Sequence, residues 1–345
     1  MSSLNRAAWI MAAKSRPLEI HAAPTGTPGP NQLLVRNHAI AINPIDVKLQ
    51  ETAMYQLDYP TIFGQDVAGE VAALGPNVAR FKKGQRVLGN TYFPSKRVED
   101  KGFQLYSIIQ EDLASEIPAD MSMVNAAVIP TGLTTAACAL FQPDCLGLQL
   151  PPASLASPAV DELPVLLIWG GASSVGCSAI QLAVAAGYRV LTTASPRNFE
   201  LVKRLGASYV VDYKSASAVS DLAEVVVASS HRVMGAVDAS GRAVGCCVEF
   251  VEKCEGVKFV AATTGGFASP PPGVTIKHIY GPSILNSHVA KAIYQEFLPR
   301  ALSDGRYAPA PEPLVVGTGL ESIQKALDLH NRGISAQKLV VSLLI

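Results

Sequence analysis

The sequence predicts an α/β protein of two domains, one an all-β domain and the other built on a doubly wound parallel sheet. Residues 1–125 carry short β-like runs separated by Gly and Pro, whereas strand and helix patterns alternate from residue 126 onward. A glycine-rich turn joins the first strand of that alternation to a helix. With 345 residues, the chain has the length of about two domains.

The all-β domain is expected to be discontinuous. Runs such as LLVRNHAIAI, VAGEVAAL and QRVLG have the composition of strands, with turn residues at short spacing. The tail KLVVSLLI is another strand, which we expect to return to this domain. The predicted domains are therefore 1–125 with 305–345, and 126–304 with a Pro-, Ala- and Ser-rich surface loop inserted at 141–164. That loop is either a tolerated insertion or a docking surface for a partner.

Apolar runs and helical stretches alternate in the second domain. Such alternation implies a parallel sheet with helices on both faces. Strands are predicted at 165–169, 188–194, 209–213, 233–238, 257–263 and 275–281, and helices at 175–187, 197–205, 216–229, 243–254, 288–303 and 319–332.

The turn VLLIWGGASSVG, which ends at Gly176, predicts dinucleotide binding. A glycine-rich loop lets the backbone approach a diphosphate, and the following helix directs its positive N-terminus at the anion. Compared with the fingerprint G-x-G-x-x-G, the chain keeps Gly171 and Gly176 but has Ser173 at the middle glycine. The alternative is an ordinary strand-to-helix turn, which also uses Gly and Ser.

The segment after the next strand indicates which dinucleotide is bound. NAD sites usually offer Asp or Glu to the ribose there, but this chain has Ser195, Pro196, Arg197 and Asn198. No carboxylate repels a 2′-phosphate, and the Arg197 guanidinium can pair with it through two hydrogen bonds. We therefore predict NADPH rather than NADH. Ser195 and Asn198 are also good caps for the next helix, and both roles are compatible.

Composition and charge narrow the possible partners and compartment. Lys and Arg total 28 and Asp and Glu total 28, and no basic run occurs, so nucleic acid is not an expected partner. We expect no apolar stretch to approach the roughly 20 residues of a membrane helix. The N-terminus is too polar for a signal peptide, which favours a cytoplasmic protein. The six cysteines lack C-x-x-C spacing, and the six histidines are scattered, so neither set predicts a metal site or a disulfide framework.

Several short motifs identify a family. They are Asn43–Asp46, Gly64–Val71, Gly84–Val87, Pro130–Ala136 and the glycine-rich loop. With them, the chain resembles the medium-chain dehydrogenase/reductase superfamily over nearly its whole length. The resemblance implies a GroES-like β domain, a Rossmann NADPH-binding domain, and an active site in the cleft between them.

The resemblance also shows which ligands of the zinc-dependent members are missing. Those members have Cys at the position of Asn43, Gly-His-Glu at 64–66, and a third ligand near Thr131. Because zinc needs thiolate, imidazole or carboxylate ligands, Asn43, Gln65 and Thr131 cannot bind it, and we predict no metal. Asp66 is interpreted as a structural turn residue.

Without zinc, the resemblance points to the quinone and enoyl reductase branch, which reduces conjugated C=C bonds. The chain is more closely similar to fungal trans-acting enoyl reductases that serve polyketide synthases. That similarity rests on Asn43–Lys48, Ser195–Phe199 with Lys203, Asp212 and Tyr213, the loop 141–164, Gly281–Ile284 and Lys338–Val341. It implies a carrier-bound substrate and a polyketide synthase as partner. Relatives occur as monomers and as homodimers.

Two candidate catalytic residues come from the same resemblance. Lys48 is expected to face the nicotinamide, where it can donate a proton or stabilise an enolate; the alternative is a solvated lysine at the end of a strand. Tyr55, or its neighbour Tyr59, is a candidate second proton donor, although loop tyrosines often only pack.

The resemblance further implies two sets of binding residues. Expected cofactor contacts are Pro44, Ile45, Asp46, Val47, Thr135, Gly171, Ser173, Ser174, Val175, Gly176, Ser195, Arg197, Asn198, Tyr213, Ala262, Thr263, Ser335 and Ala336. For Tyr213 the alternative is a half-buried tyrosine at a strand end. Expected substrate contacts are Phe63, Leu133, Phe267, Ser283, Ile284, Leu285 and Asn286.

Three kinds of function are consistent with these residues. One is a stand-alone NADPH-dependent reductase of enones, quinones or carbonyls. Another is a trans-acting enoyl reductase with a carrier-bound substrate. The last is a non-catalytic NADPH-binding protein.

Overall fold

The computed structural model describes residues 4–152, 163–229 and 231–343. The chain forms two compact units, one of Met1–Thr131, Leu298–Gly305 and Pro309–Ile345, the other of Gly132–Phe297 and Arg306–Ala308. We call them the β unit and the nucleotide unit and describe each separately. The expected domain boundary at residue 125 lies within helix α2 (Met123–Ala127).

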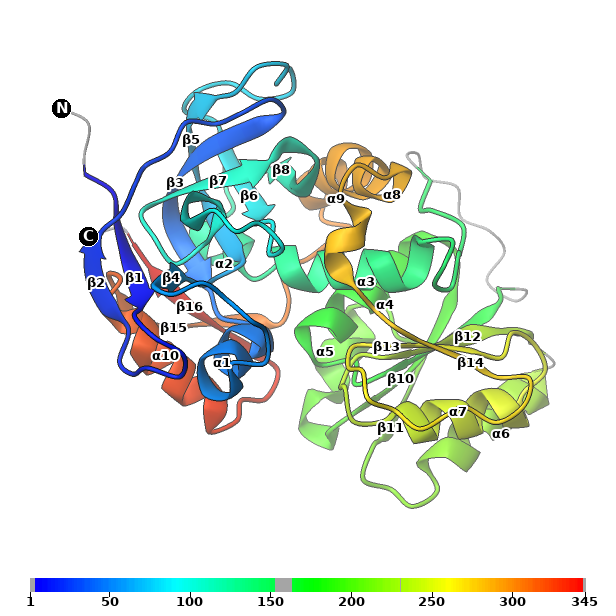
Figure 1. Ribbon diagram of the computed structural model, residues 1–345. Coiled ribbons are helices and arrows are strands. Elements are labelled where there is room, and N and C mark those ends of the chain that lie inside the picture. The colour runs from blue at the N-terminus through cyan, green and yellow to red at the C-terminus, as the bar shows by residue number, and fades with distance from the viewer. Residues whose placement is uncertain (1–3, 153–162, 230, 344–345) are drawn as a thin grey trace. The chain divides into compact units, whose positions relative to one another are not determined.

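The β unit contains two sheets among its described residues. The larger has seven strands in the order β15-β16-β3-β5-β6-β8, with β7 also paired to β3, and the smaller has the order β2-β1-β4 (Figure 1). The strands are β1 Arg6–Ile10, β2 Glu19–Ala22, β3 Gln32–Ala41, β4 Thr61–Ile62, β5 Asp66–Leu74, β6 Arg86–Asn90, β7 Tyr106–Gln110, β8 Ala114–Glu116, β15 Glu312–Thr318 and β16 Gln337–Ser342.

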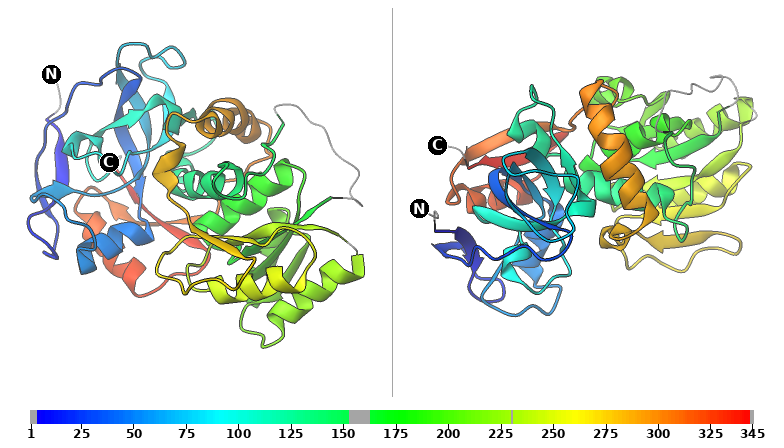
Figure 2. Two further views of the ribbon diagram at one scale, coloured as in Figure 1. Left: turned by 45° about the vertical axis from the view of Figure 1, so that its right-hand side comes forward. Right: turned by 90° about the horizontal axis from the view of Figure 1, so that it is seen from above.

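The last strand of the chain pairs with one of the first. β16 runs antiparallel to β3, with Val340 opposite Ala41, and parallel to β15 (Figure 2). The sequence analysis expected this return. Side chains from β3, β5, β6 and β16 fill a common core, among them Ile40, Val67, Val87 and Leu339.

Helices at the edges of the β unit were only partly foreseen. They are α1 Pro44–Thr52, α2 Met123–Ala127, α9 Leu298–Ser303 and α10 Ser322–Asn331, with 3-10 turns at Val98–Asp100 and Glu111–Leu113. The sequence analysis placed α10 at 319–332, but it treated residues 43–52 as part of the all-β region. Lys48 consequently lies within a helix and not at a strand end.

Local capping explains why α1 forms. Asn43 is the N-cap, Pro44 occupies the first turn, and the Asp46 side chain accepts a hydrogen bond of 2.8 Å from the Asn43 amide. The helix ends at Ala53, whose φ of 51° is left-handed. Asn43, Pro44 and Asp46 therefore determine where this helix begins.

The nucleotide unit has a single parallel sheet among its described residues. Its six strands have the order β11-β10-β9-β12-β13-β14. They are β9 Val165–Trp169, β10 Arg189–Ala194, β11 Tyr209–Asp212, β12 Val233–Asp238, β13 Phe259–Ala262 and β14 Thr275–His278, close to the predicted bounds. The order reverses between β9 and β12, and in such sheets ligands bind outside the carboxyl ends of the strands at that reversal.

Helices cover both faces of this sheet, as predicted. α4 and α5 pack on one face, and α6 and α7 on the other (Figure 1). The helices are α3 Pro130–Phe141, α4 Ser174–Ala185, α5 Phe199–Arg204, α6 Ala218–Ser229, α7 Val244–Lys253 and α8 His288–Ala290, with a π-helix at Lys291–Phe297 and 3-10 turns at Pro196–Asn198 and Gly281–Ile284. The expected helix 288–303 therefore consists of α8, the π-helix and α9.

The expectation that no apolar stretch is long enough for a membrane helix was wrong, and the described part of the expected loop is only partly at the surface. Residues Met123–Phe141 form a 19-residue stretch with mean hydropathy 1.5, long and apolar enough to span a membrane. Packing explains its composition, because 78% of the stretch is buried within the fold. Residues 142–152, expected as surface loop, begin by folding back on α3, where Leu148 is buried and its amide donates to Leu140 O at 2.8 Å. Residues 153–162 of that predicted loop lie outside the described residues.

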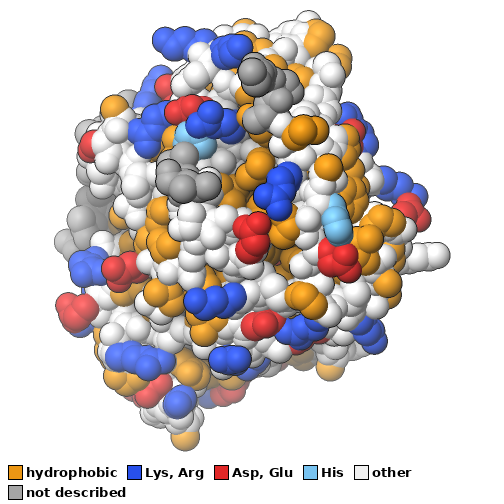
Figure 3. All heavy atoms as spheres, turned by 90° about the vertical axis from the view of Figure 1, so that its left-hand side faces the viewer, with side chains coloured by type: hydrophobic (Ala, Val, Ile, Leu, Met, Phe, Trp, Pro, Cys, Tyr) orange, Lys and Arg blue, Asp and Glu red, His pale blue; other side chains and the backbone are white. Residues whose placement is uncertain are grey.

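The surface and the cysteines agree with the composition. On the face shown in Figure 3, acidic and basic side chains are interspersed with hydrophobic ones, unlike the single basic face of many nucleic-acid-binding domains. All six cysteines lie in the described residues, and all are free thiols.

Burial of Asp46 gives the β unit a specific pH dependence. Desolvation raises the pKa of its carboxyl from 3.8 to about 7, and the Asp66 carboxylate adds to this, whereas the amides of Asn43 and Gly64 and the Lys338 ammonium oppose it. The folded state therefore binds this proton more tightly than the unfolded state. The stability that the neutral carboxyl provides is complete below pH 3.8 and is lost as the pH rises through about 7.

We predict that Asp46→Asn removes this pH dependence. An asparagine keeps an oxygen for the Asn43 amide but carries no charge to desolvate. The free energy of unfolding of the wild type should fall by up to about 4 kcal/mol more than that of the variant between pH 4 and pH 8. Urea unfolding at several pH values measures this. Asp58→Asn, at an exposed position, is the control, and an equal slope in wild type and D46N would contradict the prediction.

Candidate active site

The glycine-rich loop of the nucleotide unit is fixed by the serine that departs from the fingerprint. Ser173 is the N-cap of α4, and its Oγ accepts a hydrogen bond of 3.0 Å from the Gly176 amide. Its hydroxyl lies 2.9 Å from Gly170 O and 3.0 Å from Ala239 O, which accept its proton. Ser173 thereby joins the loop after β9 to the loop after β12, across the point where the strand order reverses.

Close packing requires the two glycines that remain. A Cβ at Gly171 would lie 2.2 Å from Thr192 Oγ1, and a Cβ at Gly176 would lie 2.2 Å from Gly170 O. Ser174 and Val175, at the start of α4, stay partly exposed. The loop therefore fits a dinucleotide diphosphate, which would lie against the exposed first turn of α4.

Asp238, at the end of β12, is a further site residue that the sequence analysis missed. Its fully buried carboxylate accepts hydrogen bonds from the amides of Ser240, Gly241 and Ala243 at 2.9–3.0 Å. Its carbonyl accepts one from Thr263 Oγ1 at 3.0 Å. An Asp followed by Ser and Gly directly after an apolar strand was the available signal.

The residues expected near the adenosine end lie after β10 and β11. Arg197 is exposed on the 3-10 turn, and Tyr213 is 44% exposed, with the Lys214 ammonium 6.0 Å from its ring centroid. Ser195 and Asn198 occupy the N-cap positions of the 3-10 turn and of α5, as the capping interpretation expected, although neither caps through its side chain. Lys203 lies 3.3 Å from the Glu200 carboxylate.

Other predicted residues of the nucleotide unit fall into two groups. Leu133, Ile284 and Ala262 are buried, whereas the remaining ones are at least partly exposed: Thr135, Thr263, Phe267, Ser283, Leu285 and Asn286. The structure brings the segment after β14 against α3, because Ser283 O accepts a hydrogen bond of 3.2 Å from Gln142 Nε2.

The β unit places a buried ammonium beside Asn43, which stands where zinc-dependent members have a cysteine ligand, and beside Asp66. Lys338 Nζ lies 2.5 Å from Asn43 Oδ1 and 2.9 Å from Asp66 Oδ2. The three residues are 0–2% exposed. Asn43 Nδ2 also donates to Asp66 Oδ2 at 3.0 Å, so the three side chains contact one another.

The second oxygen of Asp66 is satisfied by another position of the zinc site. Asp66 Oδ1 accepts hydrogen bonds from the Thr131 amide at 2.7 Å and from Thr131 Oγ1 at 2.5 Å. Asn90 Nδ2 donates to Thr131 Oγ1 at 2.9 Å. An amide, a hydroxyl, a carboxylate and an ammonium ion that already bind one another do not fit zinc. Asp66 is thus the first residue of β5 in a buried network, and its interpretation as a turn residue was wrong.

The sequence analysis used Lys338 only as part of a family motif and gave it no role, although a signal was present. A lysine within the apolar run of β16 has no place in a core unless it is paired. Its partner Asp66 lies far away in sequence, so the pairing itself was not readable.

The predicted residues around α1 differ in exposure. Pro44 and Lys48 are exposed, Ile45 is partly exposed, and Asp46 and Val47 are buried. Tyr55 is 42% exposed, with its ring centroid 5.6 Å from that of Phe93. The remaining predicted residues of this unit are Phe63, which is buried, and Ser335 and Ala336, which are partly exposed before β16; the Tyr59 hydroxyl is buried with no hydrogen-bond partner among the described residues.

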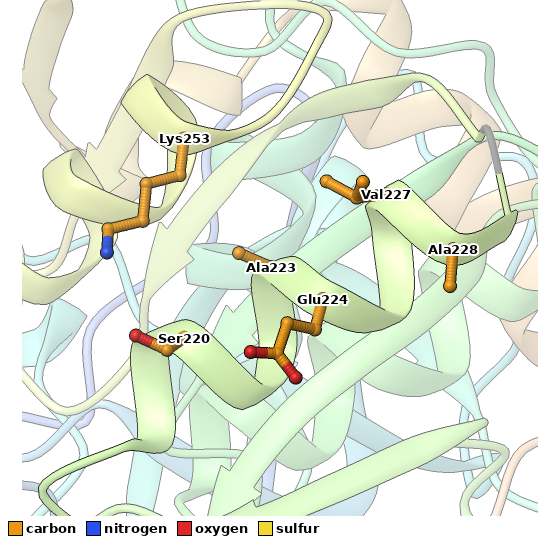
Figure 4. Close-up of a pocket in the computed structure, with 6 residues that line it drawn as sticks. All are labelled: Ser220, Ala223, Glu224, Val227, Ala228 and Lys253. Atoms are coloured by element: carbon orange, nitrogen blue, oxygen red, sulfur yellow. The ribbon is translucent and has the colours of Figure 1, made fainter.

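A hollow of about 490 Å³ lies elsewhere, between α6 and α7 (Figure 4). Lys253 of α7 faces residues of α6 across it, and none of the predicted site residues contributes to its lining. The α6 residues are Ser220, Ala223, Glu224, Val227 and Ala228.

Comparisons with known proteins agree with this description. The family model for the alcohol dehydrogenase GroES-like domain matches residues 29–115. Over 341 residues, the chain is 48% identical to the zinc-binding alcohol dehydrogenase domain-containing protein cipB of Emericella nidulans, covering 98% of each. Over 349 residues it is 38% identical to the trans-enoyl reductase himH of Aspergillus japonicus, covering 99% of this chain and 98% of the relative.

A solved structure matches over the same length. An alcohol dehydrogenase superfamily protein from Novosphingobium aromaticivorans superposes with a TM-score of 0.79 at 25% identity, covering 99% of this chain and 100% of the other. The chain is therefore an oxidoreductase of the medium-chain dehydrogenase/reductase superfamily, as its motifs predicted.

Proposed function

We propose that this oxidoreductase uses NADPH, without zinc, to reduce a conjugated C=C bond in an enoyl thioester bound to the carrier domain of a polyketide synthase. The observation that carries the proposal is the buried network in which Asn43 and Thr131, at positions where zinc-dependent members have ligands, are already hydrogen-bonded to Lys338 and Asp66. Similarity to a protein named trans-enoyl reductase supports an enoyl substrate. The polyketide synthase as partner rests on the family resemblance of the motifs.

The chemistry of the reaction defines what the protein must supply. When bound, NADPH supplies a hydride to the β-carbon of the substrate. The enolate oxygen that results needs hydrogen-bond donors, and the α-carbon needs a proton. Lys48 and Tyr55 are exposed donors on α1 and just after it, and we assign them these roles. Because Asp46 and Val47 are buried, Pro44, Ile45 and Lys48 are the predicted residues of α1 that remain available to the nicotinamide.

The nucleotide unit would bind the rest of the cofactor. The first turn of α4, shaped by Gly171, Ser173 and Gly176, is suited to the diphosphate. Arg197, exposed after β10, is suited to the 2′-phosphate. A cytoplasmic location fits a partner that is itself a biosynthetic enzyme, and we propose it on that ground.

Turnover of a panel of substrates tests the function. NADPH absorbance should fall with a short 2-enoyl thioester and not with a saturated ketone, and carrier-bound thioester should react faster than free thioester. Turnover of the ketone would overturn the proposal and indicate a carbonyl reductase. Tight NADPH binding without turnover of any electrophile would indicate a non-catalytic NADPH-binding protein.

Charge reversal at Arg197 tests the choice of cofactor. Arg197→Glu should raise KM for NADPH by about tenfold or more and change KM for NADH little, because only NADPH has the 2′-phosphate. Steady-state kinetics with both cofactors measures this. Arg204→Glu, an exposed arginine of α5, is the matched control. Equal effects of R197E on both cofactors would refute the assignment.

Removing the Lys48 ammonium tests its role as acid. Lys48→Met should lower kcat by about 100-fold, since a positioned general acid contributes on that order. Lys83→Met, at another exposed lysine of the β unit, should leave kcat unchanged. A loss of less than about threefold in K48M would remove Lys48 from the mechanism.

A further inference from the structure

We propose that Lys338 is a positioning residue for the reaction: its buried ammonium fixes the Asn43 side chain, and with it the start of α1. The inference rests on the proposed function, because α1 carries Lys48. It concerns a residue outside every set of site residues predicted above.

Lys338 connects three parts of the β unit. It lies on β16, which pairs with β15 on one side and β3 on the other. From there its Nζ contacts Asn43, which links β3 to α1, and Asp66, the first residue of β5. The Lys338 ammonium therefore binds two other chain segments. Both interactions are charge-assisted hydrogen bonds, which are shorter and stronger than hydrogen bonds between neutral groups.

The charges around the ammonium make the arrangement specific. Asp66 and Asp46 are the acidic groups nearby. Burial lowers the pKa of His330 on α10, and the Lys338 charge lowers it further. Asp66 forms the direct ion pair, and its other oxygen is bound by Thr131. A buried ammonium is costly unless its partners satisfy it, so loss of Lys338 leaves an unpaired carboxylate.

Asn43 links the Lys338 network to α1. Its side chain is bound by Lys338 and Asp66, and its amide by the Asp46 carboxyl. The side chain and the backbone amide of Asn43 are therefore both hydrogen-bonded at the start of α1. Lys48 follows on that helix, so rotation at Asn43 would displace the Lys48 ammonium, and small displacements of a catalytic group cost rate steeply.

Removing the charges of Lys338 and Asp66 together distinguishes a positioning role of Lys338 from its role in neutralising the buried Asp66 carboxylate. Lys338→Met alone should lower Tm by roughly 5 °C or more, because Asp66 stays buried and unpaired. Adding Asp66→Asn should restore most of that Tm. We expect the double variant to keep kcat at least about tenfold below wild type, with KM for NADPH within about threefold.

A second variant covers the case in which the double variant does not fold. Asn43→Ser keeps a good N-cap but is too short to reach the ammonium, and it leaves the Lys338–Asp66 pair intact. It should lower Tm less than K338M does, because the ion pair remains, and it should lose about tenfold in kcat. Arg80→Met is the control in the same unit, since Arg80 forms a partly buried pair with Glu111 outside this network. R80M should lower Tm without lowering kcat.

Amide hydrogen exchange tests whether the Lys338 network stabilises the start of α1, and it needs no measurement of turnover. Amides of residues 43–52 should exchange about tenfold faster in N43S and in the double variant than in wild type, and not in R80M. Wild-type kcat in either variant, or unchanged exchange over α1, would overturn the positioning role. If wild-type protein reduces no thioester but residues 43–52 still exchange faster in the variants, the proposed function is wrong. The stabilisation of α1 by Lys338 is then still supported.

Discussion

The ion pair between Lys338 and Asp66 is the interaction on which the geometry of the β unit depends. It joins the last strand of the chain to β5, and through Asn43 and Thr131 it reaches the starts of α1 and α3. Hydrophobic burial packs the strands but does not fix the direction of a helix that begins at the edge of a sheet. The pair supplies that direction, because each partner has a defined hydrogen-bonding geometry.

The pair also constrains the chemistry. A metal polarises a carbonyl through an open coordination position, whereas a lysine ammonium with two buried partners already directs its protons to Asn43 and Asp66. Charge that develops on a substrate oxygen must then be met by hydrogen-bond donors elsewhere. Reduction of a conjugated C=C bond requires less stabilisation of charge than reduction of a carbonyl. Its negative charge is delocalised in an enolate, which needs hydrogen bonds and one proton.

The sequence predicted features set by local pattern and missed those set by distant partners. β9 and β12 have the predicted bounds because buried parallel strands are continuous apolar runs between turn residues. α1 was missed because its capping box lies in a segment whose alternating apolar residues resemble a strand. The network around Lys338 was missed because it needs residues from four distant segments, and pairing of a buried lysine follows from tertiary structure alone.

Two departures from the family motifs differ in their effect on ligand binding. The new hydrogen-bond partners of each substituted side chain determine that effect. Ser173 replaces a glycine of the dinucleotide fingerprint, yet its hydroxyl turns inward, caps α4 and binds Ala239 O, so the loop keeps its exposed helix start. Asn43 and Thr131 replace zinc ligands, and they too turn inward, but onto the atoms that a metal would have to displace. Under the proposed function, the same kind of inward hydrogen bond would leave a diphosphate site open in one unit and would exclude a metal in the other. A departure from a motif is informative only once the new partners of its side chain are known.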